Sequence, residues 1–211
     1  MKKIVLFLLI IFSKNVFCQD YHFDKFLQYS EVDRAEIIIM TNTKDSSYIF
    51  LHKNYGNHFE GRIIDTKNKI SHFFQLKNAN ESVLFEYIDS DSIKKNKIPC
   101  YDIDNYYEIV EKPIDTISSN FKILKYKSLS KNTIIETADF DAKKVDYNTQ
   151  KISSIFFYHF IYCQKITVPY YLPTSIVVNY RNGSKVKTEL KKDVNINMVL
   201  IVKEKKYKKN K

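Results

Sequence analysis

Short runs of β-branched and aromatic residues, broken by polar residues about every ten positions, constrain this chain more than any other feature. Ile, Val, Phe, Tyr and Thr dominate the apolar set, whereas Ala is scarce and Trp is absent. Such residues suit the pleated, half-buried surface of a strand. The pattern predicts strands over residues 36–41, 47–55, 59–65, 70–76, 82–88, 106–111, 121–127, 133–137, 175–181, 184–190 and 195–202. We therefore expect a mainly β protein.

Two connectors predict hairpins between consecutive strands. Near the C-terminus, Asn182 and Gly183 tolerate the positive φ that a two-residue type I′ turn requires. With that loop, Val178 would face Lys187 across the strand pair. The polar connector 66–69 has the length of a short hairpin loop as well.

Two segments leave the choice between helix and strand open. In residues 148–162, Ile152 and Ile155 fall on one helical face, yet residues 156–162 have strong strand propensity. The spacing favours a helix of about three turns, whereas the β-rich neighbourhood favours a strand. Residues 23–29 also fit a short helix.

About ten antiparallel strands in series indicate a meander that curls into a barrel, a half-barrel or a sandwich, with one or two short helices. Closure or a covering element would protect the edge strands from pairing with other chains. This run of amphipathic strands is similar in architecture to the half-barrels of periplasmic lipoprotein carriers. The resemblance covers architecture alone, so it implies a curved sheet and no functional residue.

The first eighteen residues have the pattern of a secretory signal peptide. Two lysines precede residues 4–12, an apolar run that rises only about 14 Å as a helix, too short for a bilayer core of about 30 Å. Cleavage after Cys18 would leave Gln19 first, whereas the lipoprotein route would keep Cys18 as a lipidated residue. We expect simple cleavage, because Phe17 is large, and a periplasmic or extracellular location. This N-terminus resembles uncharacterised exported proteins of flavobacteria and their relatives.

Positive charge is concentrated at the C-terminus. The formal net charge of +10 falls to +7 without residues 1–18, and residues 203–211 alone carry +5. The remainder is nearly balanced, so the basic face that a nucleic-acid-binding domain needs is not expected. Three glycines and four prolines leave no linker that would divide the chain. We expect a signal peptide (1–18), a single β-rich domain (19–202) and a basic tail (203–211).

The basic tail has two interpretations. One is peripheral contact with anionic lipid head groups, in which each lysine near the surface contributes about 1 kcal/mol. The other is a solvated terminus, which is the more common role of such a run. The residues concerned are Lys205, Lys206, Lys208, Lys209 and Lys211.

Cys100 and Cys163 are the pair from which a disulfide is expected, because thiols outside the cytoplasm oxidise. The bridge would close a loop of about 64 residues and stabilise the fold by roughly 4 kcal/mol on the chain-entropy model. The alternative is two separate buried thiols. His159 lies four residues before Cys163, but two side chains do not complete a zinc site.

No motif identifies a catalytic or cofactor site. His52, His58 and His72 lie on or beside neighbouring predicted strands, but their spacing matches no metal motif. Asp102 and Asp104 begin a calcium-like loop that lacks its turn glycine. A phosphate-binding loop is also not expected, because the chain has only three glycines. We expect no enzymatic activity, no cofactor and no metal.

Four tyrosines are the candidate ligand-contacting or surface aromatics: Tyr106, Tyr107, Tyr170 and Tyr171. Core packing explains most aromatic residues of a β protein, so this role is the weaker interpretation. Without a catalytic motif, we expect an exported, non-enzymatic protein that binds a hydrophobic ligand or lipid in a β cavity. The alternative is a cell-envelope interaction or structural module that acts through protein or membrane-surface contacts.

Overall fold

The computed structural model describes residues 18–32, 35–54, 60–79, 82–93, 106–127, 133–156 and 168–203. Within these ranges the chain forms one antiparallel sheet of eleven strands and one helix. The prediction of a mainly β protein is confirmed, and the sheet is open, with β6 and β7 at its two ends.

The strands, in chain order, are β1 (Cys18–Glu31), β2 (Ala35–Thr41), β3 (Tyr48–Asn54), β4 (Glu60–Asp65), β5 (Ile70–Ala79), β6 (Ser82–Ser92), β7 (Tyr106–Pro113), β8 (Ser118–Tyr126), β9 (Ile134–Lys144), β10 (Tyr171–Asn179) and β11 (Lys185–Lys203). The helix α2 (Gln150–Phe156) lies between β9 and β10 in the chain.

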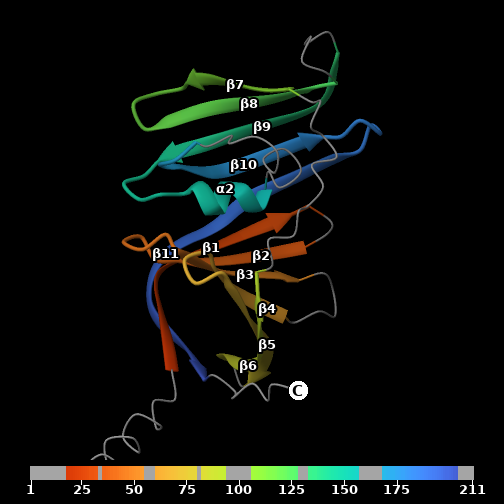
Figure 1. Cartoon of the computed structure of the whole chain (residues 1–211). Helices are drawn as coiled ribbons and strands as arrows, with labels where there is room; N and C mark the ends of the chain where they lie inside the picture. The colour runs from red at the N-terminus through yellow and green to blue at the C-terminus, as the bar shows by residue number, and fades with distance from the viewer. Residues whose placement is uncertain are drawn as a thin grey trace, which may run out of the picture.

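The first and last strands lie side by side in the middle of the sheet. The spatial order is β6-β5-β4-β3-β2-β1-β11-β10-β9-β8-β7, so the meanders β1–β6 and β7–β11 meet along the β1–β11 pair (Figure 1). This pairing runs antiparallel from Cys18 opposite Lys203 to Glu31 opposite Thr188. Register shifts near Phe23 and Tyr29 interrupt the pairing, and bulges of this kind bend a strand and increase its twist.

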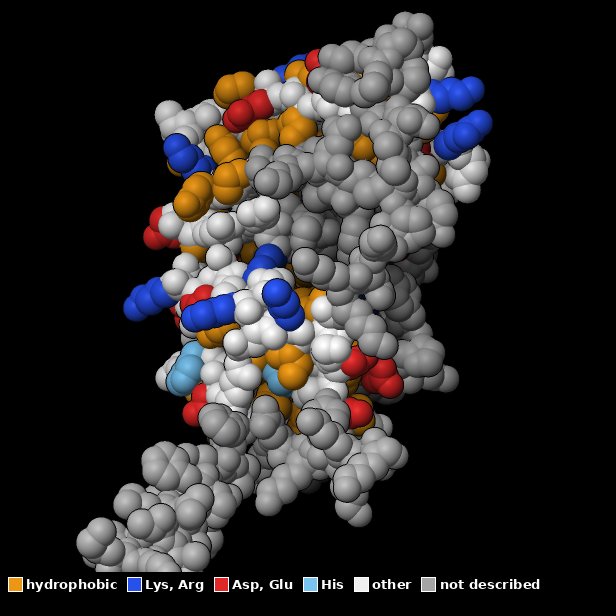
Figure 2. Space-filling model, in the orientation of Figure 1, with side chains coloured by type: hydrophobic (Ala, Val, Ile, Leu, Met, Phe, Trp, Pro, Cys, Tyr) orange, Lys and Arg blue, Asp and Glu red, His pale blue; other side chains and the backbone are white. Residues whose placement is uncertain are grey.

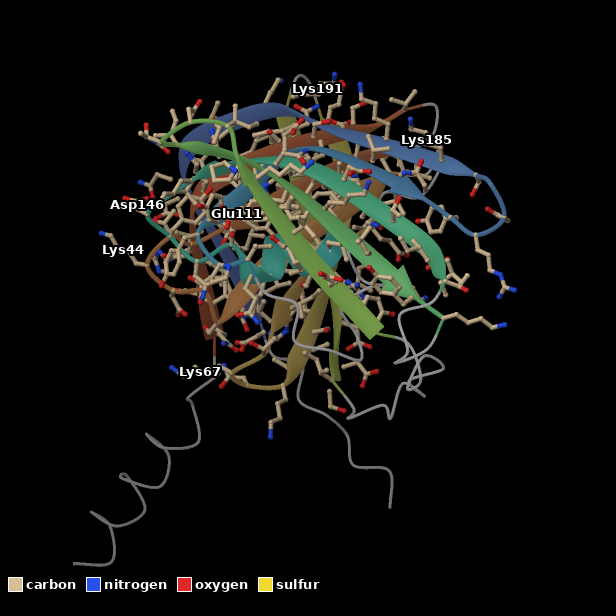
Figure 3. The ribbon with its side chains drawn as sticks, turned by 90° about the horizontal axis from the view of Figure 1, so that it is seen from above. Lys44, Lys67, Glu111, Asp146, Lys185 and Lys191 are labelled. Atoms are coloured by element: carbon tan, nitrogen blue, oxygen red, sulfur yellow. The ribbon has the colours of Figure 1, made fainter. Side chains whose placement is uncertain are left out.

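The sheet curves into an arch. Seen from above, α2 lies beneath the arch, while Lys191 of β11 lies on the outer side (Figure 3). We call the side that carries α2 the concave face and the opposite side the convex face. This open, curved sheet is compatible with the expected barrel, half-barrel or sandwich.

The C-terminal hairpin forms, but its predicted register is wrong by one residue. Val178 pairs with Val186 rather than with Lys187, and the amide of Tyr180 donates to the carbonyl of Ser184. The loop therefore has three residues, of which Gly183 takes a φ of 81°. A type I turn followed by a left-handed residue is the usual three-residue solution.

Three other expectations meet a clear outcome. The hairpin around residues 66–69 is confirmed, with Asp65 opposite Ile70. The helix over residues 23–29 is wrong, because these residues lie within β1. The strands predicted over 184–190 and 195–202 are one continuous strand, β11. In the ambiguous segment 148–162, residues 150–156 form α2, and the rest beyond 156 lies outside the described residues.

The buried apolar side chains form three clusters, named here by position. The N-terminal cluster holds Tyr21, Phe23, Met40, Tyr48, Phe50, Ile63, Phe74, Leu76, Leu200 and Val202. The central cluster holds Leu27, Tyr29, Ile37, Ile39, Ile49, Leu51, Tyr147, Ile152 and Leu172. The C-terminal cluster holds Tyr107, Phe121, Ile123, Ala138, Phe140, Ala142, Ile176 and Val178.

Strand β3 is buried on both faces. Ile49 and Leu51 belong to the central cluster, whereas Tyr48 and Phe50 alternate with them and belong to the N-terminal cluster. Successive side chains of a strand point to opposite faces. The central cluster therefore lies on the concave face with Ile152 of α2, and the N-terminal cluster packs on the other face of β3.

Candidate functional site

Helix α2 covers the place where the central and C-terminal clusters meet. Ile152 is buried in the central cluster, and Phe156 packs against both clusters. The Phe156 ring lies 4.6 Å from the Tyr29 ring. An isolated helix of seven residues is not stable in water, so these contacts hold α2 in place.

The start of α2 is fixed by two side-chain hydrogen bonds. Asn148 Oδ1 accepts from the amide of Gln150 at 2.9 Å and so caps the first turn. Thr149 Oγ1 donates to the carbonyl of Tyr171 at 2.8 Å, which ties the helix to β10. α2 is thus anchored at its first residues and held by apolar contacts beyond them.

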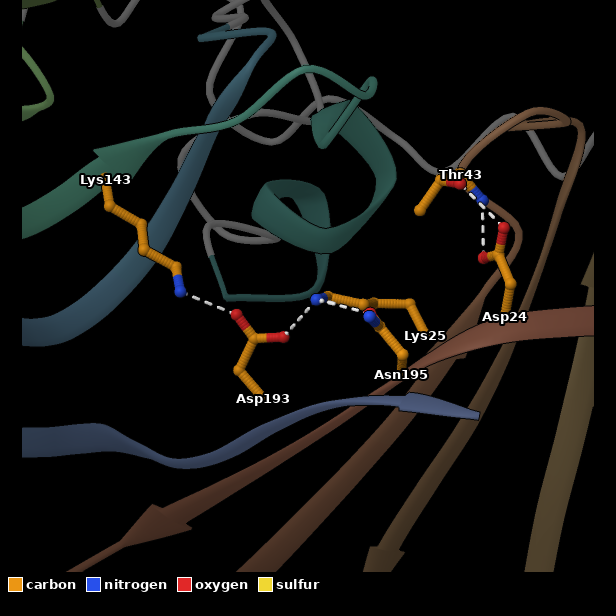
Figure 4. Close-up of polar contacts among 6 residues, drawn as sticks. All are labelled: Asp24, Lys25, Thr43, Lys143, Asp193 and Asn195. Carbon is orange, nitrogen blue, oxygen red and sulfur yellow. Dashed lines mark hydrogen bonds and ion pairs between the residues drawn. The ribbon is translucent and has the colours of Figure 1, made fainter. Parts of the chain in front are cut away.

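A charged group lies on the concave face close to α2. Asp193 accepts from Lys143 Nζ at 2.6 Å and pairs with Lys25 Nζ at 2.7 Å (Figure 4). Lys25 also donates to Asn195 at 3.1 Å. Burial would raise the pKa of Asp193, but the hydrogen bonds from Lys143 and Lys25 hold it below its usual value. These contacts join β1, β9 and β11 beneath the helix.

A second carboxylate nearby, that of Asp24, accepts hydrogen bonds from the β2–β3 turn. Asp24 accepts from the amide of Thr43 at 2.8 Å and from its hydroxyl at 2.6 Å (Figure 4). Because Asp24 follows Phe23 in β1, this contact fixes the β2–β3 turn against the first strand. It is a structural contact.

Two buried hydroxyl groups in or just before α2 have no hydrogen-bond partner among the described residues: those of Tyr147 and Ser153. Tyr147 is 6% exposed and Ser153 is 2% exposed. Burial raises the pKa of Tyr147 well above its usual value, and the charge of Asp193 raises it further. Tyr147 therefore keeps its proton. By contrast, the neighbouring Tyr29 donates to the carbonyl of Pro173 at 2.9 Å.

A buried network of hydrogen-bonded side chains crosses the N-terminal cluster. The Tyr21 hydroxyl donates to Asp65 at 2.9 Å and lies 2.8 Å from His72 Nε2. His72 Nδ1 lies 2.6 Å from Ser90 Oγ, which is 2.6 Å from the Tyr87 hydroxyl. Because Tyr21 gives its proton to Asp65, it must accept from His72 Nε2, which leaves Nδ1 as an acceptor for Ser90.

These hydrogen bonds require a neutral His72 and an ionised Asp65. Burial lowers the pKa of His72, against the opposing charge of Asp65. Burial would raise the pKa of Asp65, but hydrogen bonds from Asn68, Tyr21 and Gln19 hold it below its usual value. Ser90 beside a neutral histidine resembles half of a nucleophile site. Ser90 is only 8% exposed, and its contacts tie β5 to β6, so we assign this hydrogen-bond network a structural role.

A polar hollow of about 530 Å³ lies on the convex face, lined by residues that include Gln28, Ser30, Glu36, Asn54 and Lys191. Ser30 pairs with Glu36 of β2, on the face opposite Tyr29. Gln28 donates to Glu36 within this hollow. Polar lining of this kind does not suit a hydrocarbon.

The candidate aromatics do not form one open patch. Tyr107 is buried in the C-terminal cluster, and Tyr171 packs against the same cluster and donates to Glu111 at 3.2 Å. Tyr170 is 49% exposed. Tyr106 lies in β7, and its side chain is outside the described residues.

Hydrophobic side chains are visible over the upper part of the molecule, around β7 to β10 (Figure 2). In the β7–β8 turn, Ile114 and Ile117 are 61% and 63% exposed. Apolar surface therefore reaches solvent at this end of the arch.

The remaining candidate residues divide into two groups. His52 is buried and its Nδ1 lies 2.8 Å from the carbonyl oxygen of Glu60, so it does not converge with His72. The others lie outside the described residues: Cys100, Cys163, His58, His159, Lys205, Lys206, Lys208, Lys209 and Lys211. No group of three metal-ligating side chains occurs in the described ranges. None of the described helical structure is long and apolar enough to cross a bilayer.

No sequence pattern points to Asp193, Lys25, Lys143 or Tyr147. These residues come from β1, β9, β11 and the segment before α2, so only the fold brings them together. Comparison with known proteins adds no assignment, because no family model and no curated protein matches the chain.

Proposed function

We propose that this is an exported, non-enzymatic protein that binds a hydrophobic molecule, such as a lipid acyl chain, on the concave face of its sheet. The observation that carries the proposal is the apolar floor made by the central and C-terminal clusters. Phe156 spans both clusters from a helix of seven residues. Displacing α2 would expose apolar side chains of both clusters beside the charged group of Asp193, Lys143 and Lys25.

The energetics permit such an exchange. Burial of a large apolar side chain contributes about 1.5–3 kcal/mol, so releasing Ile152, Ile155 and Phe156 costs up to roughly 9 kcal/mol. An acyl chain of about fifteen methylenes gains roughly 12 kcal/mol when buried, at about 0.8 kcal/mol for each. The two quantities are of the same order, so contacts with an acyl chain can replace the contacts of the helix.

Binding of a pyrene-labelled alkane to the purified protein tests this function. Phe156→Ala weakens the cover and is expected to tighten binding, because less apolar contact must be broken. Val178→Thr places a hydroxyl in the floor at nearly constant shape and is expected to weaken binding.

Ile38→Thr is the matched control, because Ile38 alternates with the floor residues Ile37 and Ile39 and so faces the convex side. It should leave binding unchanged. Failure of the folded wild-type protein to bind the alkane would reject the proposed function.

A second candidate function is a contact with another envelope protein along β6. This edge strand contains neither proline nor lysine, and its Val83 and Leu84 are 48% and 54% exposed. Edges of this kind can accept a further strand. A photo-cross-linker at position 84 should then give one defined adduct in the native cell, whereas one at position 189 on the convex face should not.

A further inference from the structure

Of the two hydroxyls without a partner among the described residues, that of Tyr147 belongs to the proposed binding surface, and that of Ser153 belongs to the helix above it. Tyr147 belongs to the central cluster, which forms part of the apolar floor, and Ser153 is a buried residue of α2. Buried polar groups in proteins are almost always hydrogen-bonded, so each such group needs an explanation. A hydroxyl that faces a ligand surface finds its partner on the ligand.

The charges around Tyr147 restrict what that partner is. The carboxylates of Asp193, Asp146 and Asp24 all act on the Tyr147 hydroxyl and favour its protonated form. Both lysines of the neighbouring charged group are already bound to Asp193. No uncompensated cation among these residues would balance an anionic head group.

A protonated hydroxyl in this setting acts as a donor. An ammonium group has no lone pair to accept its proton, and a carboxylate would meet the field of three acids. An uncharged carbonyl oxygen accepts a hydrogen bond without adding charge.

We propose that the ligand of the concave face is an uncharged acyl ester, and that Tyr147 donates a hydrogen bond to its carbonyl oxygen. This inference rests on the proposed function and adds the polar group of the ligand to it. The acyl chain covers the apolar floor, and the ester lies at the edge where Tyr147 and the charged group meet.

Competition against the pyrene-labelled alkane distinguishes the ligand classes. Methyl palmitate and palmitate have the same chain and differ at the carboxyl group. At neutral pH, the wild-type protein should bind the ester more tightly than the free acid, because the charge of the acid meets the three carboxylates near Tyr147. It should also bind the ester about five- to tenfold more tightly than unlabelled hexadecane, the range expected for one hydrogen bond. Tyr147→Phe should remove this preference and leave binding of the alkane unchanged.

Tyr29→Phe is the matched control in the same cluster. It removes a hydroxyl that already has a protein partner, the carbonyl of Pro173, so it should destabilise the fold and keep the ester preference. Tyr147→Phe should not lower the melting temperature, because its hydroxyl has no partner among the described residues.

The outcomes separate the two proposals. If the ester and the acid bind equally, or if Tyr147→Phe keeps the preference for the ester over hexadecane, the ester assignment is overturned while hydrocarbon binding stands. A lower melting temperature of Tyr147→Phe would show that the hydroxyl is used within the protein and would overturn it too. If neither the alkane nor the ester binds, both proposals fail.

Discussion

His72 is held neutral between two hydroxyl groups. Its Nε2 donates to Tyr21 and its Nδ1 accepts from Ser90, so both ring nitrogens are used by the uncharged form. At 1% exposure, a second proton on the ring would receive little help from water. Burial accordingly lowers the pKa of His72.

We predict that this histidine makes the fold sensitive to mild acid. The pKa of His72 is lower in the folded protein than in the unfolded chain, where it is about 6.5. Its contribution is therefore complete above that pH and is lost as the pH falls, by up to about 1.4 kcal/mol for each pH unit. Urea unfolding between pH 7.5 and 4.5 measures this slope.

His72→Gln should flatten the slope over that range, at the cost of lower stability at pH 7.5. His22→Gln is the control, because His22 is an exposed histidine of β1, next to Tyr21 in the sequence. An unchanged slope in His72→Gln would contradict the prediction. Below about pH 4, Asp65 and Asp193 add a further loss, because their pKa values are lowered in the folded state and their stabilisation disappears on protonation.

Gly61 is fixed by close packing. A Cβ atom at this position would lie 2.4 Å from Phe50 Cζ and 3.0 Å from Leu76 Cδ1. Phe50 is fully buried between its neighbours and has little room to move. We predict that Gly61→Ala lowers the free energy of unfolding by about 1–3 kcal/mol through overpacking, as measured by urea denaturation.

Gly183→Ala provides the contrast. A Cβ atom there meets nothing within 4 Å, but φ is 81°. Gly183→Ala therefore lowers the free energy of unfolding through backbone strain alone. Asn tolerates a positive φ better than Ala, so Gly183→Asn should be more stable than Gly183→Ala, whereas Gly61→Asn should not be more stable than Gly61→Ala. Equal rescue at both positions would contradict this distinction.

At the scale of elements, local patterns predicted strands well and their pairing less well. The hairpin around residues 66–69 follows from alternation and a polar connector. The helical spacing of Phe23, Phe26 and Leu27 was misleading, because β1 packs on both sides: Leu27 is in the central cluster, and Phe26 contacts the N-terminal cluster. A strand with two buried faces imitates helical periodicity.

The start of α2 offers a test of its role as a cover. We predict that Asn148→Ala, which removes the acceptor for the Gln150 amide, destabilises α2 by about 1 kcal/mol. Hydrogen exchange of the amides in residues 152–156 should become faster, with the central strands unaffected. The same variant should bind the pyrene-labelled alkane more tightly. Weaker binding would show that α2 supports the ligand surface.

At the scale of the molecule, the fold class followed from the sequence but the centre of the sheet did not. Pairing of β1 with β11 joins residues at opposite ends of the chain, and no local pattern reports on such a contact. The same limit applies to the candidate site. Lys25 and Asp193 are ordinary charged residues in the sequence and become a half-buried ion pair only when the two meanders meet.

The β1–β11 pair should carry the stability of the whole sheet. We predict that deletion of residues 195–211 abolishes cooperative unfolding, because it removes Leu200 and Val202 from the N-terminal cluster and uncovers half of β1. Deletion of residues 204–211 alone is the control, since β11 ends at Lys203. Circular dichroism during heating measures both. A cooperative transition in the longer deletion would contradict the prediction.

The position of β1 also decides when the protein can fold. β1 is among the first strands to leave the ribosome, and β11 is the last. Until β11 appears, one edge of β1 is unpaired and the N-terminal cluster lacks two of its buried residues. Contacts between distant parts of a chain form late in folding. If the first eighteen residues direct export as proposed, this strand order keeps the sheet incomplete, and the chain easier to thread through a secretion channel, until β11 has been made.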